Sequence, residues 1–227
     1  MTTEVSIVLP AHNEEGNILR TISLFESELN QLDYEIVVVD DGSTDETARL
    51  VLERQPQNNR VQLLKHPANR GYGAALRTGF TSASGEWIFF TDSDLQFHPQ
   101  DFHRLWEYRR QCNVILGYRN PRKDPTFRKI NAYCWGMYVR WMFGLRVRDL
   151  NCAFKLFRGD LLHRVLLESN GAFINAELLV QLHHQNVPFC EIPVEHFARQ
   201  QGVQTGAKPL VILSAFEESL RLRHRLR

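Results

Sequence analysis

The sequence predicts a single α/β domain whose mostly parallel sheet is flanked by helices. Strand-like and helix-like segments alternate along the first half of the chain, an order typical of parallel sheets with helical crossovers. The expected strands are short runs rich in β-branched and aromatic residues, as in strands buried on both faces. A length of 227 residues suits one large α/β domain, and the chain contains no linker, repeat or low-complexity segment that would divide it.

Apolar periodicity defines most of the elements expected before residue 120. The expected strands are Val5–Leu9, Tyr34–Val39, Val61–Lys65, Trp87–Thr91 and Val114–Tyr118. The expected helices lie at 18–29, after 45, at 71–83 and at 99–110. Ser43 or Thr44 is the expected cap of the second helix, because short hydroxyl side chains accept hydrogen bonds from the first amides of a helix. Pro99 opens the fourth helix, a favoured position for proline.

The second half is less regular. The expected elements are a helix over Phe127–Phe143, a strand over Cys152–Phe157, a helix over Asn175–Gln185 and a strand over Pro188–Val194. The last segment has apolar residues at helical spacing and several arginines, which predicts a basic amphipathic helix. The expected organisation is one domain over residues 1–209 followed by a C-terminal basic amphipathic helix over residues 210–227.

Composition argues against several classes of function. The net charge is +1, so no overall field favours nucleic acid, and we expect no nucleic-acid partner. The cysteines, Cys112, Cys134, Cys152 and Cys190, form no C-x-x-C pair. Their spacing argues against a disulfide framework and a zinc site, and it fits a reducing compartment. Because no leader is visible and no apolar run approaches about 20 residues, we expect a cytoplasmic protein that meets a membrane only peripherally.

One segment has the clearest chemical signal. The apolar strand Trp87–Thr91 runs directly into Asp92 and Asp94, and Gln96 follows two residues later. Alternate residues of an extended or turning chain project to the same side, so these three oxygen-bearing side chains can converge on one cation. Carboxylate and amide oxygens are ligands that Mg²⁺ and Mn²⁺ prefer, usually together with substrate phosphates. The alternative is a polar loop after a strand, the commoner meaning of an isolated Asp-x-Asp.

Polar side chains also follow other strands. Asp40 and Asp41 come at the end of the second expected strand, and Arg119 follows the fifth. Such sheets bind ligands beyond the carboxyl ends of their strands, so we group these residues with Asp92 and Asp94. An aspartate at a strand end can accept hydrogen bonds from a nucleobase or a ribose. The alternative for the acidic segment after the second strand is a tight turn followed by a helix cap.

The glycines of Asn69–Gly79 echo a dinucleotide-binding fingerprint only superficially. Their second spacing is too long, and no Gly-Lys-Ser/Thr of a phosphate-binding loop follows. The segment therefore argues against a Rossmann oxidoreductase. Glycines in such a position more often let the backbone pass close to a ligand or to the sheet.

Three further features have more than one interpretation. The basic and aromatic residues from Phe127 to Arg148 predict a solvated helix face over a core stripe or a phosphate-binding cluster; a nucleic-acid surface fits the near-neutral overall charge less well. Glu177, at a helix start, either favours the helix dipole or orients a basic site residue. Arg199 lies in the Gly-rich segment Ala198–Gly206, which is either a flexible loop or a lid that grips phosphate.

Several motifs, taken in order, resemble those of one enzyme family. They are Val5–Glu15, Val37–Asp45, Asn69-x-Gly-x-Gly-Ala-Ala75, Asp92–Gln96, Gly117-x-Arg119, Asp149-x-Asn-Cys-Ala-Phe-Lys155, and Glu191–Val194 followed by Arg199. The set is similar to that of inverting family 2 glycosyltransferases of the GT-A fold, a Rossmann-like single domain, and it spans residues 4–209. Asp-x-Asp-Leu-Gln resembles the branch of dolichyl-phosphate mannose synthase and related polyprenyl-phosphate glycosyltransferases.

The resemblance implies a metal-dependent, inverting transfer of a sugar from a nucleotide sugar, GDP-mannose or a UDP-hexose, to a polyprenyl or dolichyl phosphate. The acceptor phosphate is already anionic, so no general base is needed, and catalysis rests on positioning and leaving-group stabilisation. Two alternatives stay open. One is a family 2 enzyme with a soluble or saccharide acceptor, which needs a base for a neutral hydroxyl. The other is a non-catalytic nucleotide-sugar-binding subunit.

The resemblance also implies roles for individual residues. The residues expected to line the base and ribose pocket are Pro10, Ala11, Glu14 and Asp41. The residues expected to hold Mg²⁺ or Mn²⁺ are Asp94 and Gln96, with Asp92 supporting the metal site beside the ribose and the sugar. The residues expected to contact donor or acceptor phosphates are Arg119, Arg128 and Arg199. The implied catalytic set is Asp92, Asp94, Arg119 and Arg199.

Two departures from the family pattern lie in the second half. Ala153-Phe154 stands where many relatives have Gly-Phe, which keeps a small residue. Gly202–Lys208 stands where many have Gly-x-Ser-Lys, and Lys208 is the candidate for that lysine. Many bacterial relatives continue into membrane helices, so we expect a membrane surface or a membrane-anchoring subunit as a partner. The tail helix either lies on a bilayer or packs on the core.

Overall fold

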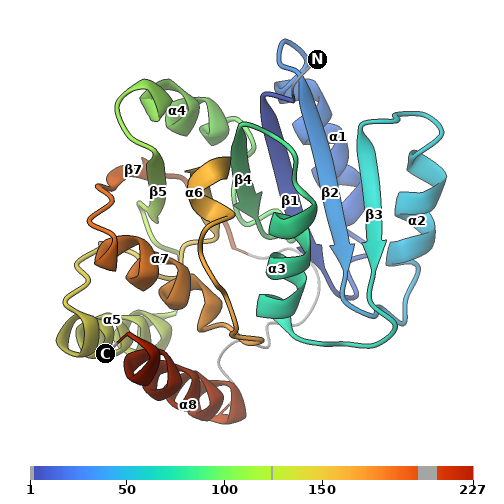
Figure 1. The fold of residues 1–227 in the computed structure, drawn as a ribbon. Coiled ribbons are helices and arrows are strands. Elements are labelled where there is room, and N and C mark those ends of the chain that lie inside the picture. The colour runs from blue at the N-terminus through green and yellow to red at the C-terminus, as the bar shows by residue number, and fades with distance from the viewer. Residues whose placement is uncertain (1–2, 124, 199–208, 227) are drawn as a thin grey trace.

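The structure is a computed structural model that describes residues 3–123, 125–198 and 209–226. Its centre is a seven-stranded sheet with strand order β3-β2-β1-β4-β6-β5-β7 (Figure 1). The strands are β1 (Val5–Ala11), β2 (Tyr34–Asp40), β3 (Val61–Lys65), β4 (Trp87–Thr91), β5 (Val114–Arg119), β6 (Phe154–Arg158) and β7 (Cys190–Val194). Strand β6 pairs antiparallel with β4 and β5, and the other pairs are parallel. The predicted α/β domain with a mostly parallel sheet is confirmed.

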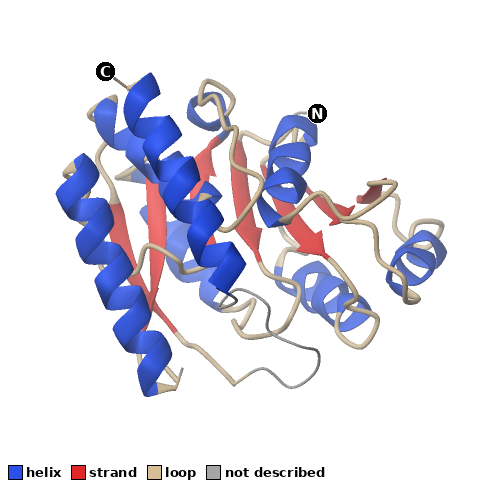
Figure 2. Cartoon of the chain, turned by 90° about the horizontal axis from the view of Figure 1, so that it is seen from below, coloured by secondary structure: helices blue, strands red, loops and turns tan. Residues whose placement is uncertain are grey.

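Helices cover both faces of the sheet (Figure 2). They are α1 (Ile18–Glu28), α2 (Thr47–Arg54), α3 (Tyr72–Ser82), α4 (Asp101–Glu107), the 3₁₀ turn η1 (Tyr108–Arg110), α5 (Thr126–Phe143), α6 (Gly159–Leu162), α7 (Ile174–His184) and α8 (Pro209–Arg225). In β4, Phe89 packs against Phe25 of α1 and Phe102 of α4, whereas Phe90 packs against Phe80 of α3. Successive strand residues point to opposite faces, so α1 and α4 cover one face and α3 the other.

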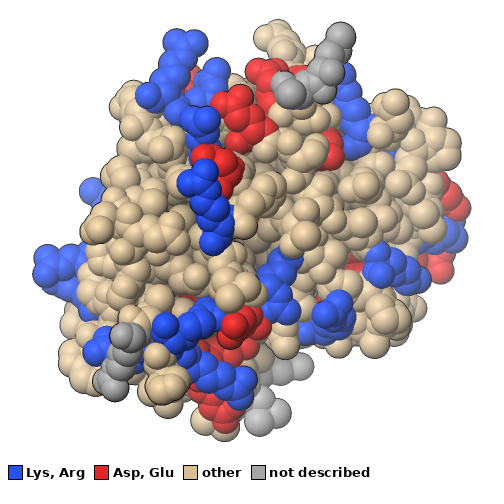
Figure 3. All heavy atoms as spheres, viewed as in Figure 1, with Lys and Arg blue, Asp and Glu red and all other residues tan. Residues whose placement is uncertain are grey.

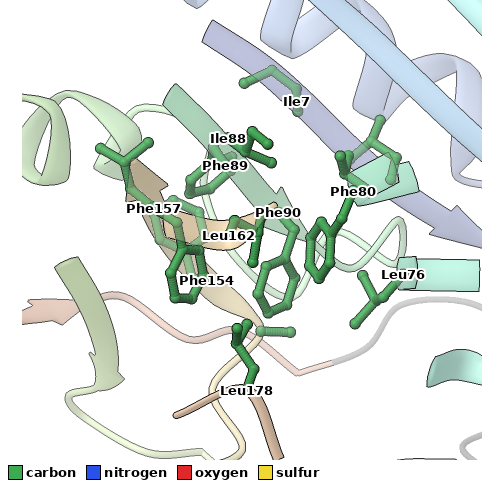
Figure 4. Close-up of a cluster of buried hydrophobic side chains, with 14 of the residues drawn as sticks. Ile7, Leu76, Phe80, Ile88, Phe89, Phe90, Phe154, Phe157, Leu162 and Leu178 are labelled. Carbon is green, nitrogen blue, oxygen red and sulfur yellow. The ribbon is translucent and has the colours of Figure 1, made fainter. Parts of the chain in front are cut away.

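The aromatic core is centred on β4. All five of its residues are buried, because strands pair with both of its edges and helices cover both faces. Figure 4 shows its phenylalanines beside Phe154 and Phe157 of β6. The rings of Phe89 and Phe154 meet edge to face with centroids 4.7 Å apart, a geometry that adds about 0.5–1.5 kcal/mol beyond burial. This packing makes rigid the strand that ends at the Asp-x-Asp segment.

The predicted elements agree in position, with ends shifted by up to three residues, whereas the short helix α6 was not predicted. The cap of α2 is a correction. The N-cap position is Glu46, which makes no side-chain cap hydrogen bond, and the amide of Thr47 donates to Asp45 Oδ1 at 3.0 Å. Ser43 Oγ instead accepts a hydrogen bond from the amide of Asn13 at 2.9 Å. A short polar side chain near a helix start bonds whichever amide it reaches, and the path of the turn decides which one that is.

The expectation that the cysteines form no disulfide is wrong. Cys112 and Cys190 form a disulfide, with Cα atoms 6.1 Å apart. Cys112 stands two residues before β5 and Cys190 begins β7, and the parallel pairing of these strands brings the two together. Their separation of 78 residues gives no sign of this proximity in the sequence. The bridge removes the cysteine-based reason for expecting a reducing compartment.

Helices α5 and α8 lie side by side beyond one edge of the sheet (Figure 2). Phe216 of α8 packs against Tyr138 and Trp135 of α5, with ring centroids 4.8 and 5.4 Å apart. The hydroxyl groups of Tyr138 and Ser219 are hydrogen-bonded at 2.8 Å. The interpretation of Trp135 and Tyr138 as packing residues is confirmed. Within the described ranges, no helix combines the length and the apolar character needed to cross a membrane.

Candidate functional site

The strand ends place the predicted site residues along one edge of the sheet. Strands β1, β2 and β4 run parallel, so their carboxyl ends meet at the same edge, which is the lower edge in Figure 1. Strand β5 runs in the same direction, because β6 is antiparallel to both β4 and β5. Ala11, Asp40, Asp92 and Arg119 therefore stand at or just after the ends of these four strands. Open α/β sheets bind their ligands at this edge.

Asp94 and Gln96 belong to one tight turn after β4. The amide of Gln96 donates to Asp94 Oδ1 at 3.1 Å, and Leu95 between them has a left-handed backbone with φ of 57°. Asp94 is 5% exposed. Gln96 Nε2 donates to Phe197 O at 3.2 Å and lies 3.4 Å from His196 Nε2. The chain after β7 therefore orients the Gln96 side chain through its NH₂ group, and the amide oxygen is the atom that a cation would take.

The donor atoms of this turn suit a hard divalent cation. Asp92 and Asp94 supply carboxylate oxygens and Gln96 supplies an amide oxygen. Among the described residues, no group of three or more His, Cys, Asp or Glu side chains is arranged to hold a metal ion. Mg²⁺ is commonly bound by one or two carboxylates together with substrate phosphates and water, and Mn²⁺ prefers similar ligands. The residues present therefore fit Mg²⁺ or Mn²⁺ shared with a diphosphate.

A network of hydrogen bonds between largely buried polar side chains leads to Asp92. The hydroxyl of Tyr72, the first residue of α3, donates to Asp92 Oδ1 at 2.9 Å. Tyr72 also bonds with the side chain of Asn175, whose Oδ1 accepts a hydrogen bond from Lys155 Nζ at 3.0 Å. Lys155 is fully buried and also donates to Cys152 O. Side chains from α3, α7 and β6 thus form one chain of contacts that ends at the Asp-x-Asp segment.

Burial shifts the pKa of two members of this network. It lowers the pKa of Lys155 to about 8, because desolvation disfavours the ammonium form. Burial also raises the pKa of Tyr72 well above its usual value, and the negative charge of Asp92 adds to the shift. Tyr72 is therefore protonated at neutral pH and can donate to the carboxylate. Groups perturbed in this way are concentrated at functional sites.

Asp41 anchors the loop that precedes α3. Its Oδ1 accepts hydrogen bonds from the amide of Arg70 at 2.9 Å and from His66 Nδ1 at 2.7 Å, and its Oδ2 accepts one from the amide of Gly71 at 2.8 Å. Gly71 has φ of +100°, and a Cβ there would lie 2.4 Å from Asn170 O, so glycine is required. Gly71 thus approaches the loop before α7, whereas the predicted close approach to the sheet is confirmed at Gly79, where a Cβ would lie 2.3 Å from Val8 Cγ1 of β1. Because Asp41 Oδ2 accepts one hydrogen bond here and a carboxylate oxygen can accept a second, these contacts are compatible with base recognition by Asp41, which stays a prediction.

Asp149 holds Arg119 in a bidentate ion pair. Arg119 Nε donates to Asp149 Oδ2 at 2.6 Å, and Nη2 donates to Oδ1 at 2.8 Å. The two side chains are only 10% and 8% exposed. Burial raises the pKa of Asp149, but the hydrogen bonds and charge of Arg119 outweigh it, so the pKa lies below its usual value. The pair fixes the plane of the guanidinium group at the edge of the sheet.

Apart from Asp41, which follows β2, the residues predicted to line the base and ribose pocket lie at the end of β1 and shortly after it. Pro10 and Ala11 are the last two residues of β1, and Pro10 O accepts a hydrogen bond from Ser93 Oγ at 2.9 Å. This bond links the end of β1 to the Asp-x-Asp segment. Glu14 is 8% exposed and accepts a hydrogen bond from Asn17 Nδ2 at 2.7 Å.

The predicted basic residues are less uniformly placed. Arg128 lies in the first turn of α5, directly after the segment that follows β5, and is half-buried. Arg199 and Lys208 lie outside the described residues. Glu177 is buried and accepts hydrogen bonds from the amide of Ser169 at 2.8 Å and from Arg225 Nη2 at 2.6 Å. The basic residue that contacts Glu177 is therefore Arg225 of α8, and this ion pair holds α8 against the rest of the domain.

Four residues with contacts to the site gave little or no signal in the sequence. Lys155 gave the strongest of these weak signals, because a lysine within a largely apolar strand must find buried partners. Asp149 was a motif position without a role, and Tyr72 was one position in a glycine-rich segment. His196 gave no signal, since its contact with Gln96 joins residues 100 positions apart. Each of these contacts depends on the packing of distant segments.

Comparison with known families decides the membership of this chain. The model of glycosyl transferase family 2 matches residues 6–170. The chain belongs to glycosyl transferase family 2. This family 2 chain is 28% identical over 214 residues to dolichyl-phosphate beta-glucosyltransferase of Dictyostelium discoideum, covering 84% of the chain and 65% of that protein. It is 31% identical over 209 residues to dodecaprenyl-phosphate galacturonate synthase of Rhizobium johnstonii, covering 88% of the chain and 61% of that protein.

The family 2 chain therefore spans slightly less than two thirds of the length of these curated relatives. A solved structure, glucosyl-3-phosphoglycerate synthase from Mycobacterium tuberculosis in complex with Mn²⁺, UDP-glucose and phosphoglyceric acid, superposes with a TM-score of 0.74 at 21% identity. The superposition covers 97% of this chain and 79% of that one. At this identity the likeness shows the fold alone, and it confirms the GT-A fold expected from the sequence motifs.

Proposed function

We propose that this family 2 chain transfers a sugar from a nucleotide sugar to a polyprenyl phosphate, with inversion at the anomeric carbon. The observation that carries the proposal is the placement of Asp92, Asp94 and Gln96 at one sheet edge with the Arg119–Asp149 pair. The names of the two relatives, which specify dolichyl and dodecaprenyl phosphate, support the acceptor class. Those names describe proteins longer than this chain, so its activity is part of the proposal.

The cation site of the proposal is the turn after β4. Asp94 and Gln96 would hold Mg²⁺ or Mn²⁺, with Asp92 in support. When bound, the cation supplies positive charge that offsets the charge developing on the departing nucleoside diphosphate. The hydrogen bond from Tyr72 keeps the Asp92 carboxylate in one orientation. The Mn²⁺ and UDP-glucose named for the solved relative are in keeping with this assignment.

The nucleotide and the phosphates would be held on either side of this turn. On the β1–β2 side, the proposed base and ribose pocket is lined by Pro10, Ala11, Glu14 and Asp41. On the β5 side, the proposed phosphate contacts are made by Arg119 and Arg128. Arg199, which lies outside the described residues, is a third proposed phosphate contact. A guanidinium group has five N–H donors, so its orientation by Asp149 is compatible with a phosphate contact by Arg119.

The acceptor phosphate oxygen would attack the anomeric carbon while the bond to the nucleoside diphosphate breaks. This oxygen is already anionic, so the chain has to exclude water and align the two substrates rather than remove a proton. A polyprenyl phosphate resides in a membrane, so we propose that the chain works at a membrane surface, either directly or through an anchoring subunit. A cytoplasmic location stays a prediction.

A transfer assay tests the proposal. The purified full chain is incubated with detergent-solubilised polyprenyl phosphate, Mg²⁺ or Mn²⁺, and radiolabelled GDP-mannose, UDP-glucose or UDP-GlcNAc in parallel reactions. We expect one donor to label the organic phase and the label to disappear on chelation. If the donor binds in a metal-dependent way and is turned over without labelling the organic phase, the acceptor is soluble rather than lipid. If the donor binds but is not turned over, the chain has a binding role instead of an enzymatic one. Absence of both binding and label would overturn the proposal.

A further inference from the structure

Exposed apolar side chains gather on the outer surface of α5 and α8. The exposed side chains that form it, called here the outer face, are Phe127, Ile130, Tyr133, Met137 and Trp141 of α5, with Leu213, Phe216 and Leu220 of α8. Trp141 is 78% exposed and Tyr133 is 69% exposed. Single exposed apolar residues are ordinary, but a contiguous group of them marks a surface that meets another phase or another molecule.

Helical spacing explains why these side chains share one surface. The five members from α5 recur at steps of three or four residues, so they form one stripe along the helix. Val139 and Phe143, which pack into the core, lie on the opposite side of α5. The α8 members are continuous with this stripe, because Phe216 contacts Tyr138 and the ring of Tyr138 lies 6.4 Å from that of Trp141. Helix α5 thus has one apolar stripe for the core and a second that faces outward.

A basic groove runs along the other side of the α5 stripe. It has a volume of about 540 Å³ and lies between α5 and the segment 145–151. The cationic side chains that line it are Arg122, Lys129, Arg140, Arg146 and Arg148. Two carboxylates also line it, but Asp149 is held by Arg119 and Glu191 accepts a hydrogen bond from the amide of Arg148 at 2.6 Å. Tyr133 and Met137 of the outer face form part of its wall.

The positive charge of the groove is a local feature. The whole chain has a net charge of only +1, so the excess of cations over carboxylates at the groove is balanced elsewhere. Figure 3 shows Lys and Arg side chains, together with Asp and Glu, in the lower part of the molecule, where Figure 1 places α5 and α8. An apolar stripe with an aromatic residue and a bordering row of cations matches the two layers of a membrane surface with acidic lipids.

We propose that the outer face and the basic groove together dock the protein on the surface of a bilayer that contains anionic lipids. The apolar stripe, with Trp141 at its end, enters the boundary between headgroups and acyl chains, and the groove receives acidic headgroups. A second protein surface would favour the apolar stripe equally, but it gives no reason for five cations along the border. The complementary charge therefore selects the lipid surface.

The docking surface is continuous with the proposed active site. Arg122 lines the groove, and its Nη1 lies 3.9 Å from Asp149 Oδ1, within the cluster that holds Arg119. Helix α5 begins seven residues after the end of β5, on the same edge of the sheet. Docking through this surface would present the site to phosphates at the membrane surface. The inference deepens the proposed function and relies on it only for the identity of the acceptor.

Flotation with acceptor-free vesicles tests the docking surface without any transfer reaction. The full chain is mixed with vesicles of phosphatidylcholine alone or of phosphatidylcholine with phosphatidylglycerol. We expect flotation with the acidic vesicles only, and a decrease with added salt because screening weakens the attraction. Trp141→Ser and, separately, Arg146→Gln should lower the partition coefficient, the arginine change by about fivefold. Circular dichroism and thermal melting establish that each variant is folded.

Matched substitutions on other surfaces provide the controls. Leu52 is 53% exposed on α2, and Arg110 is exposed at the end of η1, before β5 begins. Leu52→Ser and Arg110→Gln should leave flotation unchanged. Failure of the wild-type chain to float, or equal losses in the controls, would overturn the proposal. So would a dimer that Trp141→Ser dissociates while flotation is retained. Transfer to detergent-solubilised acceptor is scored separately, so failure of docking and failure of the proposed function give different results.

Discussion

The two halves of the sheet hold their site residues in different ways. In the β1–β4 half, backbone amides nearby in space do most of the holding: two adjacent amides and one histidine fix Asp41, and the amide of Gln96 bonds Asp94. In the β5–β7 half, an ion pair between side chains does the holding at Arg119, whose guanidinium group donates two hydrogen bonds to Asp149. The difference teaches that substitutions in the first half should test chemistry, while those in the second half should disturb position and stability together.

The largest expected effect is in the first half. Asp94→Ala removes a proposed cation ligand, so transfer should fall by orders of magnitude. The protein should stay folded and lose about 1–3 kcal/mol of stability, because the hydrogen bond from the Gln96 amide is lost. Asp160→Ala, at an exposed carboxylate in α6, is the matched control and should keep wild-type turnover. Turnover near the wild-type rate in Asp94→Ala would rule out the cation assignment.

In the second half, Asp149→Asn should disturb activity and stability together. Loss of the charge loosens Arg119, and misplacement of a phosphate-binding group should lower kcat/KM for the acceptor by about 10- to 100-fold. The free energy of unfolding should fall by about 1–3 kcal/mol, because a nearly buried guanidinium loses a charged hydrogen-bond partner. Kinetics and urea unfolding measure both effects.

Asp160→Asn is the control for this comparison. Its carboxylate is 51% exposed and pairs with Arg158 and Arg164 on the surface, so its loss should change stability by less than about 1 kcal/mol. If Asp149→Asn proves as harmless as this control, the Arg119–Asp149 pair does not position a site residue.

The disulfide offers a second way to weaken the β5–β7 half. Cys112→Ser opens a bridge between residues 78 positions apart, which should lower the free energy of unfolding by about 2–4 kcal/mol. Cys134→Ser, at an exposed free thiol, should have no such effect. Thermal melting with and without reductant measures the difference. If the melting temperature of the wild-type chain is the same with and without reductant, the bridge contributes no stability.

A further expected effect, seen only at alkaline pH, is the pH response of Lys155. The unfolded chain keeps this proton up to the ordinary lysine pKa of 10.5, whereas the native protein loses it at about 8. Between these values the unfolded state binds more protons, so the contribution of Lys155 to the free energy of unfolding rises with pH; below pH 8 it is constant. The free energy of unfolding of the wild type, minus that of Lys155→Met, should therefore rise by about 3 kcal/mol across this pH window.

Urea unfolding of both proteins from pH 7 to 10.5 measures this shift. Lys65→Met, at an exposed lysine that ends β3, should give a difference from wild type that is flat with pH. If the difference in the free energy of unfolding between wild type and Lys155→Met also stays constant with pH, the buried lysine keeps its proton throughout this range.

The sequence by itself determined the α/β fold, the position of almost every element and the grouping of Asp41, Asp92 and Arg119 at one sheet edge. These follow from local rules: apolar periodicity sets strands and helices, and parallel order brings carboxyl ends together. The ordered motifs also identified the family. Local reasoning failed at the start of α2, where Ser43 bonds the distant amide of Asn13 and Asp45 bonds the amide of Thr47.

Only the tertiary structure decided which distant groups meet. The bridge between Cys112 and Cys190, the contact of His196 with Gln96 and the chain from Lys155 to Asp92 join segments whose pairing no local pattern encodes. The same holds for the outer face, since periodicity predicts an apolar stripe but not whether the core or the solvent receives it. Helix α5 carries two such stripes, and the space beside the sheet accommodates only one of them.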